Sequence, residues 1–253
     1  MHLTPQLSKT VGRSIGSLFI PFLESSGAYG PNQFAYSKGK SHKDTLMINV
    51  CSWILLMECG FLVGVYCSDV SGAFDRVEAE RMGAKLAVLG LRSDVFGFLH
   101  SWLEGRCSKV VQGGSCSETV PLQDSVYQGT VLGSPLWNVF YADSREPLQR
   151  CGYTETNFAD DLNCWKAFAK VVPPAGAYGP LPGHGPVLAD LRGVQRELHL
   201  WGAANRVTFD PAKESFHILH RTLHHGETFK VLGCVFESQL LMHAAARHVA
   251  IEV

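Results

Sequence analysis

The sequence predicts an α/β (α+β) protein in which helices pack on a mostly antiparallel sheet. Helical periodicity recurs in segments such as 3–24, while the apolar run from Phe61 to Cys67 has the length of a buried strand. Gly113-Gly114 and residues 153–165 each carry a hairpin signal. With 46% hydrophobic and 18% charged residues over 253 positions, the chain has the composition of a folded protein.

The amino-terminal quarter predicts two helices and the first strand. Apolar residues recur at spacings of three or four along residues 3–24, which is typical of an amphipathic helix. Ser41 and Asp44 form a capping-box pattern at the start of a second helix, which ends near Glu58. A glycine turn then leads into a strand from Phe61 to Asp69.

Residues 51–67 are the most membrane-like stretch, and a membrane span is the alternative interpretation of them. A span needs about 20 apolar residues in succession, whereas Glu58 and Gly60 interrupt this run. We therefore expect no membrane association. Lys9 and Arg13 likewise interrupt the apolar residues of the N-terminus, so a signal peptide is not expected.

The middle of the chain predicts helices and a hairpin. One helix is expected over Asp75–Leu89, and a second begins at a Ser93 cap and runs to Gly105. The glycine pair at 113–114 predicts a hairpin over residues 109–120. Another helix is expected after Gln128-Gly129.

The last third predicts a second hairpin, a loop, a helix and two strand segments. The hairpin spans Tyr153–Trp165 and carries Asp160-Asp161 at its tip. The other expected elements are the Pro/Gly-rich loop at Val172–Pro186, the helix near Val187–Trp201, and strands around Phe216–Leu219 and Phe229–Phe236.

Charge and cysteine content limit the functional classes. A net charge of −1 and a pI near 6.8 count mildly against a nucleic-acid-binding protein, although clustered acids can mask a local basic patch. The eight cysteines form no CxxC pair, which favours free thiols in an intracellular compartment, nucleus or cytoplasm, over a disulfide framework. Zinc is the less favoured interpretation of the histidines at 217–225, because no fourth ligand falls at a recognisable spacing.

Three carboxylates suggest a metal site. Asp160 and Asp161 are adjacent, and like charges ~4 Å apart repel by about 4 kcal/mol at an effective dielectric near 20. A divalent cation removes that cost. If the strand that ends at Asp69 neighbours the 153–165 hairpin, the acids converge at one sheet edge, where oxygen ligands suit Mg²⁺. Two such ions can stabilise both the attacking and the leaving oxygen of a phosphoryl displacement.

Four blocks, in the correct order, resemble the reverse transcriptases, most closely those of non-LTR retrotransposons. They are Gln33–Ser41 (fingers motif), Asp69–Val77 (first palm motif), Gln128–Trp137 (template and nucleotide motif) and Phe158–Asp161 (catalytic hairpin). Leu232-Gly233 resembles the primer-grip turn of this family. The resemblance implies the palm of a right-hand polymerase, with partial fingers and a thumb that is largely missing.

The resemblance also implies an RNA-directed DNA polymerase chemistry. Asp69 and Asp160 would be the main ligands of two Mg²⁺ ions, or of Mn²⁺, with Asp161 beside them and the Val70 carbonyl as an auxiliary ligand. The reaction would be in-line nucleotidyl transfer from a dNTP to the 3′-hydroxyl of a DNA primer on an RNA template. Lys213 falls near the departing pyrophosphate in this family, as a general acid or simply as a surface lysine.

Five further residues are implied to bind the nucleotide. Phe74 falls at the steric gate, where a flat ring rejects a 2′-hydroxyl; a core aromatic is the alternative. Gln128 and Gly129 would line the incoming nucleotide, because glycine permits close approach and an amide can hydrogen-bond sugar or base. Lys38 and Lys40 would contact the triphosphate, unless they belong to a solvated basic loop.

The implied organisation departs from the family in some places. Ser37 stands where the fingers motif usually has arginine, and Phe158 replaces the commoner tyrosine. The expected divisions are partial fingers at 1–60, palm at 61–170, a loop at 171–186, the rest of the palm to the primer-grip hairpin at 187–240, and the start of a missing thumb or tail at 241–253. We therefore expect the fingers–palm part of a larger or decayed retroelement protein.

Two alternatives remain open. A catalytically inactive, nucleic-acid-binding relic of the same fold would account for the missing arginine and the neutral net charge. A two-metal nuclease would share the acids, but it gives no reason for Gln128-Gly129 or Phe74.

Overall fold

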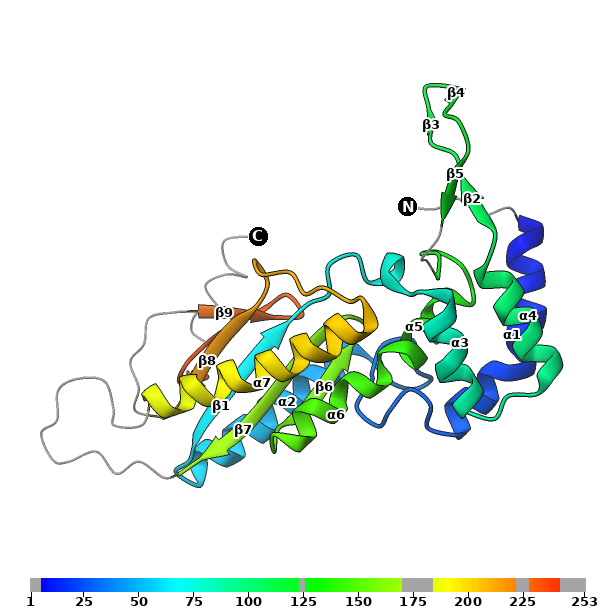
Figure 1. The fold of residues 1–253 in the computed structure, drawn as a ribbon. Coiled ribbons are helices and arrows are strands. Elements are labelled where there is room, and N and C mark those ends of the chain that lie inside the picture. The colour runs from blue at the N-terminus through cyan, green and yellow to red at the C-terminus, as the bar shows by residue number, and fades with distance from the viewer. Residues whose placement is uncertain (1–5, 123–125, 170–183, 222–227, 242–253) are drawn as a thin grey trace, which may run out of the picture. The chain divides into compact units, whose positions relative to one another are not determined.

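The computed structural model describes residues 6–122, 126–169, 184–221 and 228–241, and the chain divides into two compact units (Figure 1). Unit 1 consists of residues 1–31, 72–143 and 204–207. Unit 2 consists of residues 32–71, 144–203 and 208–253. These units cut across the divisions expected for fingers and palm, so that assignment stays a prediction.

Unit 2 is built on a four-stranded antiparallel sheet in the order β6-β7-β1-β8. Its strands are β1 (Leu62–Ser68), β6 (Thr154–Phe158), β7 (Asp161–Phe168) and β8 (Ser215–Leu219). Every residue of β1 is buried, because this strand lies between β7 and β8 and both of its faces are covered. The predicted buried strand and the mostly antiparallel sheet are therefore confirmed.

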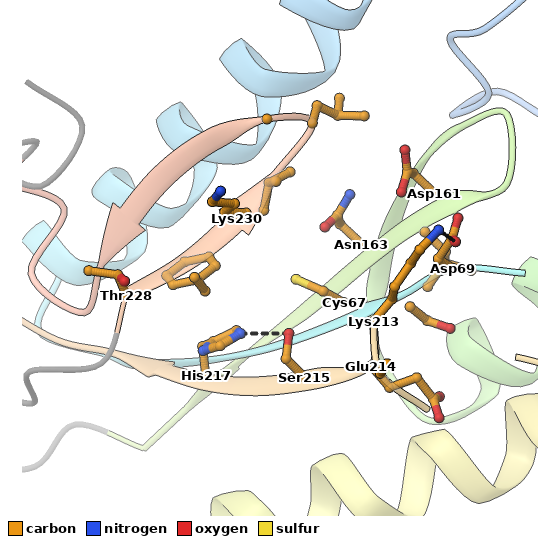
Figure 2. A pocket seen from close by; sticks show the side chains of 17 residues that line it. Cys67, Asp69, Asp161, Asn163, Lys213, Glu214, Ser215, His217, Thr228 and Lys230 are labelled. Atoms are coloured by element: carbon orange, nitrogen blue, oxygen red, sulfur yellow. Dashed lines mark hydrogen bonds and ion pairs between the residues drawn. The ribbon is translucent and has the colours of Figure 1, made fainter. Parts of the chain in front are cut away.

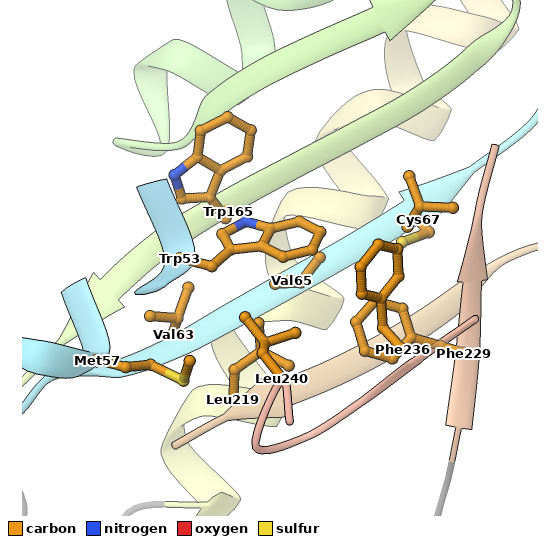
Figure 3. Packing of buried hydrophobic residues seen from close by; sticks show 11 residues of the cluster. Trp53, Met57, Val63, Val65, Cys67, Trp165, Leu219, Phe229, Phe236 and Leu240 are labelled. Carbon is orange, nitrogen blue, oxygen red and sulfur yellow. The ribbon is translucent and has the colours of Figure 1, made fainter. Parts of the chain in front are cut away.

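One face of the sheet packs against α2 (His42–Glu58) and against the hairpin of β9 (Thr228–Val231) and β10 (Cys234–Glu237). Trp53 of α2 is central to this core: its ring centroid lies 6.2 Å from that of Trp165 and 6.1 Å from that of Phe229 (Figure 3). Alternate residues of β1 enter the same core, as the strand period of two requires.

The opposite face of the sheet is covered by α6 (Arg145–Arg150) and α7 (His184–Asn205) (Figure 1). A Cβ added to Gly64 would lie 3.0 Å from the Val187 side chain, so glycine lets α7 approach the sheet closely. The helix predicted near 187–201 is confirmed and is longer at both ends. Most of the loop predicted at 172–186, and the segment 242–253, lie outside the described residues.

The start of α2 has the predicted capping box. The Ser41 hydroxyl accepts a hydrogen bond from the Asp44 N–H at 3.4 Å, and the Asp44 carboxylate accepts one from the Ser41 N–H at 2.7 Å. These bonds fix the start of α2 at His42, the residue after the predicted fingers motif, because the N–H groups of Ser41 and Asp44 both have partners.

Unit 1 is mainly helical and carries two short antiparallel ladders. Its elements are α1 (Gln6–Ser25), the 3₁₀ turns η1 (Ala73–Arg76) and η2 (Ala142–Ser144), α3 (Ala79–Val88), α4 (Ser93–Leu103), α5 (Gly133–Tyr141), and the strands β2 (Arg106–Ser108), β3 (Val111–Gln112), β4 (Ser115–Cys116) and β5 (Val120–Leu122). β2 pairs with β5 and β3 with β4, which confirms the hairpin predicted at 109–120.

Two predicted helix starts are wrong. The helix expected from Asp75 is at first a 3₁₀ turn, and α3 begins only at Ala79. The break follows from Val77, which is fully buried with an extended backbone (φ −83°, ψ 100°) and cannot continue a helix. Ser93 is the first residue of α4 rather than its cap, and the cap position before it makes no side-chain hydrogen bond.

No helix within the described ranges is both long and apolar enough to traverse a bilayer. All eight cysteines are free thiols. Cys67 and Cys164 are buried in the sheet of unit 2, and burial raises the pKa of Cys67 to about 12, so that this thiol stays neutral.

Candidate active site

The end of β1 and the tip of the β6–β7 hairpin bring acidic residues together. Ser68 pairs with Leu162 in the β1–β7 ladder, so extending this register by one residue puts Asp69 opposite Asp161. Asp69 is buried and Asp161 is half-buried. Antiparallel pairing therefore unites acids that lie far apart in the sequence.

Asp160 lies in the two-residue loop of this hairpin. Phe158 pairs with Asp161, so Ala159 and Asp160 alone make the connection. Ala159 has a φ of 60°, which residues other than glycine rarely adopt. A positive φ at the first loop residue is typical of the tight hairpin turns whose twist matches that of the strands. The backbone of this turn determines where its acids stand.

The acids repel one another. Burial and the negative charge of Asp69 raise the pKa of Asp161 to about 6, and the charge of Asp160 adds to this. Burial and the charge of Asp69 also raise the pKa of Asp160. Raised carboxyl pKa values in a cluster of acids indicate negative charge that nearby cations compensate only in part.

Lys213 supplies one positive charge to this cluster. Its ammonium group donates a hydrogen bond to the buried Asp69, while the lysine side chain itself is largely exposed (Figure 2). This hydrogen bond, together with the charge of Asp69, raises the pKa of Lys213. The Asp210 N–H donates to the Asp69 carbonyl at 3.0 Å, and the Lys213 N–H donates to the Asp210 carbonyl at 2.9 Å. The structure thus places Lys213 with the acids, and its role as a general acid stays a prediction.

A hard divalent cation fits the chemistry of this cluster, because its donors are carboxylate oxygens with uncompensated charge. Within the described residues, no group of three or more His, Cys, Asp or Glu side chains is close enough to hold one ion. Mg²⁺ is often bound by one or two carboxylates and completes its shell with water and substrate phosphates, so the acids still suit it. Val70 is buried and pairs with Phe209, which fixes the backbone next to Asp69. The ligand set of Asp69, Val70, Asp160 and Asp161 stays a prediction.

A cavity of about 450 Å³ opens beside the acids in unit 2 (Figure 2). Asp69, Asp161 and Lys213 line one part of it, and the predicted primer-grip turn Leu232-Gly233 lines another. The fold therefore gathers positions from separate sequence motifs around one space, which is large enough for part of a substrate.

Further polar residues line this cavity, although the family resemblance predicts none of them as site residues; they include Asn163, Ser215, His217 and Lys230. Cys67 of β1 pairs with Asn163 on one side and with Ser215 on the other, so the three residues lie on one face of the sheet. Asp69 follows Cys67 by two positions and therefore lies on the same face. The strand register identifies Asn163, Ser215 and His217, and a single sequence does not contain it.

His217 is held against the β9–β10 hairpin. Its ring stacks on Phe229 with centroids 4.1 Å apart, and its Nε2 lies 2.8 Å from the Ser215 hydroxyl. Burial lowers the pKa of His217 to about 4, so the ring is neutral at pH 7. Of the other clustered histidines, His224 and His225 lie outside the described residues.

The fingers-motif lysines differ in their surroundings. Lys38 is exposed. The Lys40 ammonium donates to the Gln33 carbonyl at 3.0 Å and lies 4.8 Å from the centroid of the Phe34 ring, and burial lowers its pKa. Lys40 therefore has a structural partner within its own motif, while triphosphate contacts by either lysine stay predictions.

The predicted nucleotide-binding residues after Gly72 belong to unit 1. Phe74 is half-buried and stacks on Trp137, with centroids 5.9 Å apart and an interplanar angle of 28°. Gln128 and Gly129 are exposed, and Gly129 has a φ of 84°. Just beyond them, a Cβ on Gly133 would lie 2.4 Å from a backbone carbonyl oxygen, so only glycine fits there. That these residues act with the acids of unit 2 stays a prediction.

One curated protein supports the family resemblance. No family model matches this sequence. The chain is 30% identical over 169 residues to the probable RNA-directed DNA polymerase from transposon X-element of Drosophila melanogaster. The match covers 64% of this chain but only 18% of that protein, so the chain spans less than a fifth of this relative. The predicted resemblance to non-LTR retrotransposon reverse transcriptases is thereby confirmed.

Solved telomerase structures support the fold. The apo telomerase of Candida tropicalis, truncated from its C-terminal domain, has a TM-score of 0.61 at 10% identity, over 92% of this chain and 44% of that one. The telomerase of Candida albicans, in complex with a TWJ fragment of telomeric RNA, has a TM-score of 0.56 at 11% identity, over 91% of this chain and 37% of that one. The mixed helix and antiparallel-sheet fold is therefore similar to that of telomerase.

Proposed function

We propose that this chain carries the polymerase core of an RNA-directed DNA polymerase of the non-LTR retrotransposon type, as part of a larger retroelement protein. It would transfer a nucleotide from a dNTP to the 3′-hydroxyl of a DNA primer paired with an RNA template. The observation that carries the proposal is the meeting of Asp69 with Asp160-Asp161, beside a cavity that Lys213 also lines.

The acids of unit 2 are proposed to hold two Mg²⁺ ions. Asp69, Asp160 and Asp161 would supply carboxylate oxygens, and Val70 a carbonyl oxygen. When bound, such ions activate the primer 3′-hydroxyl and neutralise charge on the triphosphate. Two observations support this: burial and the charge of Asp69 raise the pKa of Asp160 and of Asp161, and Asp69 already binds a cationic side chain, Lys213. The exposed Lys213 ammonium would donate a proton to the departing pyrophosphate.

The residues proposed to select the nucleotide lie in unit 1. Phe74 would act as the steric gate against a 2′-hydroxyl, since its ring is held in one plane by stacking on Trp137. Gln128 and Gly129 would line the nucleotide, which their exposure permits. Leu232-Gly233 would contact the primer from the wall of the cavity. Asp161 lines the same cavity.

Primer extension on a primed RNA template, with Mg²⁺ and dNTPs, tests the proposal. Asp160→Asn should slow extension about a thousandfold, since one lost ligand charge worth about 4 kcal/mol corresponds to that factor. Asp190→Asn is the matched control. It removes the same charge from α7, where Asp190 pairs with Lys166 at 3.2 Å, and should change the rate by less than about twofold.

Three other results would contradict the proposal. Equal rates for the wild type and Asp160→Asn would show that the metal-site assignment is wrong. Salt-dependent binding of RNA without any extension would favour the inactive relic. Release of nucleotides from unprimed RNA would favour a nuclease.

A further inference from the structure

The side chain of Gln33 lies against the backbone of the acidic turn. Its Oε1 accepts a hydrogen bond from the Ala159 N–H at 3.0 Å, and its Nε2 donates one to the Ala159 carbonyl at 3.1 Å. Gln33 is only 3% exposed and Ala159 only 8%, so water competes little for these groups. One amide side chain therefore satisfies both backbone polar groups of the residue that precedes Asp160.

This contact is part of a longer pairing along the edge of the sheet. The Phe34 N–H donates to the Asn157 carbonyl, and the Asn157 N–H donates to the Asn32 carbonyl, both at 2.9 Å. Residues 32–34 therefore run parallel to the edge strand β6, with Gln33 bridged to Asn157. Where β6 ends, the side chain of Gln33 continues the pairing that the backbone begins.

Gln33 is itself held in place by further hydrogen bonds. Its Oε1 also accepts from the Ala35 N–H at 3.0 Å, and its backbone carbonyl accepts from the Lys40 ammonium at 3.0 Å. A side chain whose oxygen is bound twice and whose nitrogen is bound once has little freedom to rotate. It can therefore act as a rigid support for its neighbour.

The acidic turn needs such a support for three reasons. Ala159 has a φ of 60°, where an L-residue is strained unless its surroundings hold it. In addition, the repulsion among Asp69, Asp160 and Asp161 favours any rearrangement that moves the turn away from β1. Without Gln33, the buried N–H and carbonyl of Ala159 would also lose their partners, which is costly.

We infer that Gln33 is a positioning residue for the acidic turn: it fixes the backbone of Ala159 and thereby directs the carboxylates of Asp160 and Asp161. The use of those carboxylates rests on the proposed function, whereas the support of the turn is a property of the fold. The fingers motif would then have a structural task at the catalytic hairpin, 126 positions away in the sequence.

Amide exchange at residues 159–161, in the full chain without metal or substrate, measures this support directly. Gln33→Met keeps the length of the side chain and removes both bonds to Ala159, so protection of these amides should fall about 30-fold, the equivalent of two hydrogen bonds. Gln149→Met is the matched control, because Gln149 of α6 donates to Glu155 of the same hairpin at 3.3 Å. This control should leave the protection of the turn unchanged.

Gln33→Glu adds a test that depends on pH. When protonated, the new carboxyl group accepts and donates as the amide does; when ionised, it only accepts. Burial beside the acids raises the pKa of a carboxyl group at this position. Protection of the turn, compared with the wild type at the same pH because Asp161 also titrates near pH 6, should therefore approach that of the wild type at about pH 5 and fall below it at about pH 8. If Gln33→Met does not fold, this pH dependence decides, and its absence would overturn the inference.

Mn²⁺ binding followed by electron paramagnetic resonance extends the test to the acids. Loss of the support should weaken binding about 10- to 100-fold in Gln33→Met, as loss of outer-shell partners generally does. Turn protection equal to that of the wild type would overturn the inference even in an active polymerase. Reduced protection in a chain that extends no primer would instead uphold the inference and overturn only the proposed function.

Discussion

Unit 2 contains two hairpin turns at predicted functional motifs, and they are specified in different ways. Leu232-Gly233, between β9 and β10, has φ values of 48° and 82°, and a Cβ on Gly233 would meet nothing within 4 Å. Ala159-Asp160, between β6 and β7, has its positive φ at a buried alanine and is bonded to Gln33. The first turn has a glycine at one of its positive-φ positions, while Leu232 at the other packs against the core of unit 2; the second turn has no glycine and is bonded to a distant side chain.

The difference teaches how a site can be made rigid. Glycine makes a turn easy to form locally, but it also leaves other conformations accessible. A turn that carries interacting acids must hold one geometry against their repulsion, so alanine with an external amide support suits it better. The chain thus has a glycine in the exposed β9–β10 turn and a long-range contact at the turn that carries the acids.

The largest expected effect is a loss of stability in acid, through the contact of His217 with the β9–β10 hairpin. His217 stacks on Phe229 of β9, and burial lowers its pKa to about 4, below its value of about 6.5 in the unfolded chain. Between these values the unfolded state binds more protons, so the free energy of unfolding falls as the pH drops from about 6.5 to 4, by up to about 3 kcal/mol. Denaturant unfolding of the wild type and His217→Phe across this range should show the steeper loss in the wild type.

The acidic turn responds to pH with the opposite sign, so the variant is needed to isolate the histidine. The pKa of Asp161 is raised to about 6, hence its folded form binds more protons and gains stability as the pH falls. This gain offsets part of the histidine effect in the wild type and is equally present in His217→Phe. Parallel pH profiles for the two proteins would therefore contradict the burial of a neutral His217.

Gly233→Ala should destabilise the protein moderately and show that the exposed turn depends on local conformation. Its φ of 82° disfavours alanine, while the space around it is open, so the cost is conformational only. We expect the free energy of unfolding to fall by about 1 kcal/mol. Thermal or denaturant unfolding measures this, and amide exchange at residues 159–161 should be unaffected. A loss above about 3 kcal/mol would indicate a packing role for Gly233 instead.

What could be predicted from the sequence follows the same distinction. The buried strand β1, the Ser41 capping box and the hairpin with an acidic tip all have local signals, and the structure contains them. The break at Val77 has no local signal, because tertiary burial imposes it. The contact of Gln33 with the turn, and the place of Asn163 in the cavity, depend on strand order and register, which a local pattern does not encode.

Ala159→Gly is expected to have the smallest effect, although it changes the acidic turn itself. Glycine relieves the positive φ, which favours the folded state by about 1 kcal/mol, but it adds a similar entropy to the unfolded chain. The free energy of unfolding should therefore change by less than about 0.5 kcal/mol. Both Gln33 bonds go to backbone atoms and survive, so exchange at residues 159–161 should stay close to that of the wild type.

The same substitution becomes informative when Gln33→Met is also present. With the support removed, glycine at position 159 should let the turn open further, so protection in the double variant should fall below that of Gln33→Met alone. If the two substitutions instead act additively, the turn is held by its own backbone preference. Non-additivity at residues 159–161 therefore separates a turn specified by a distant side chain from one specified locally.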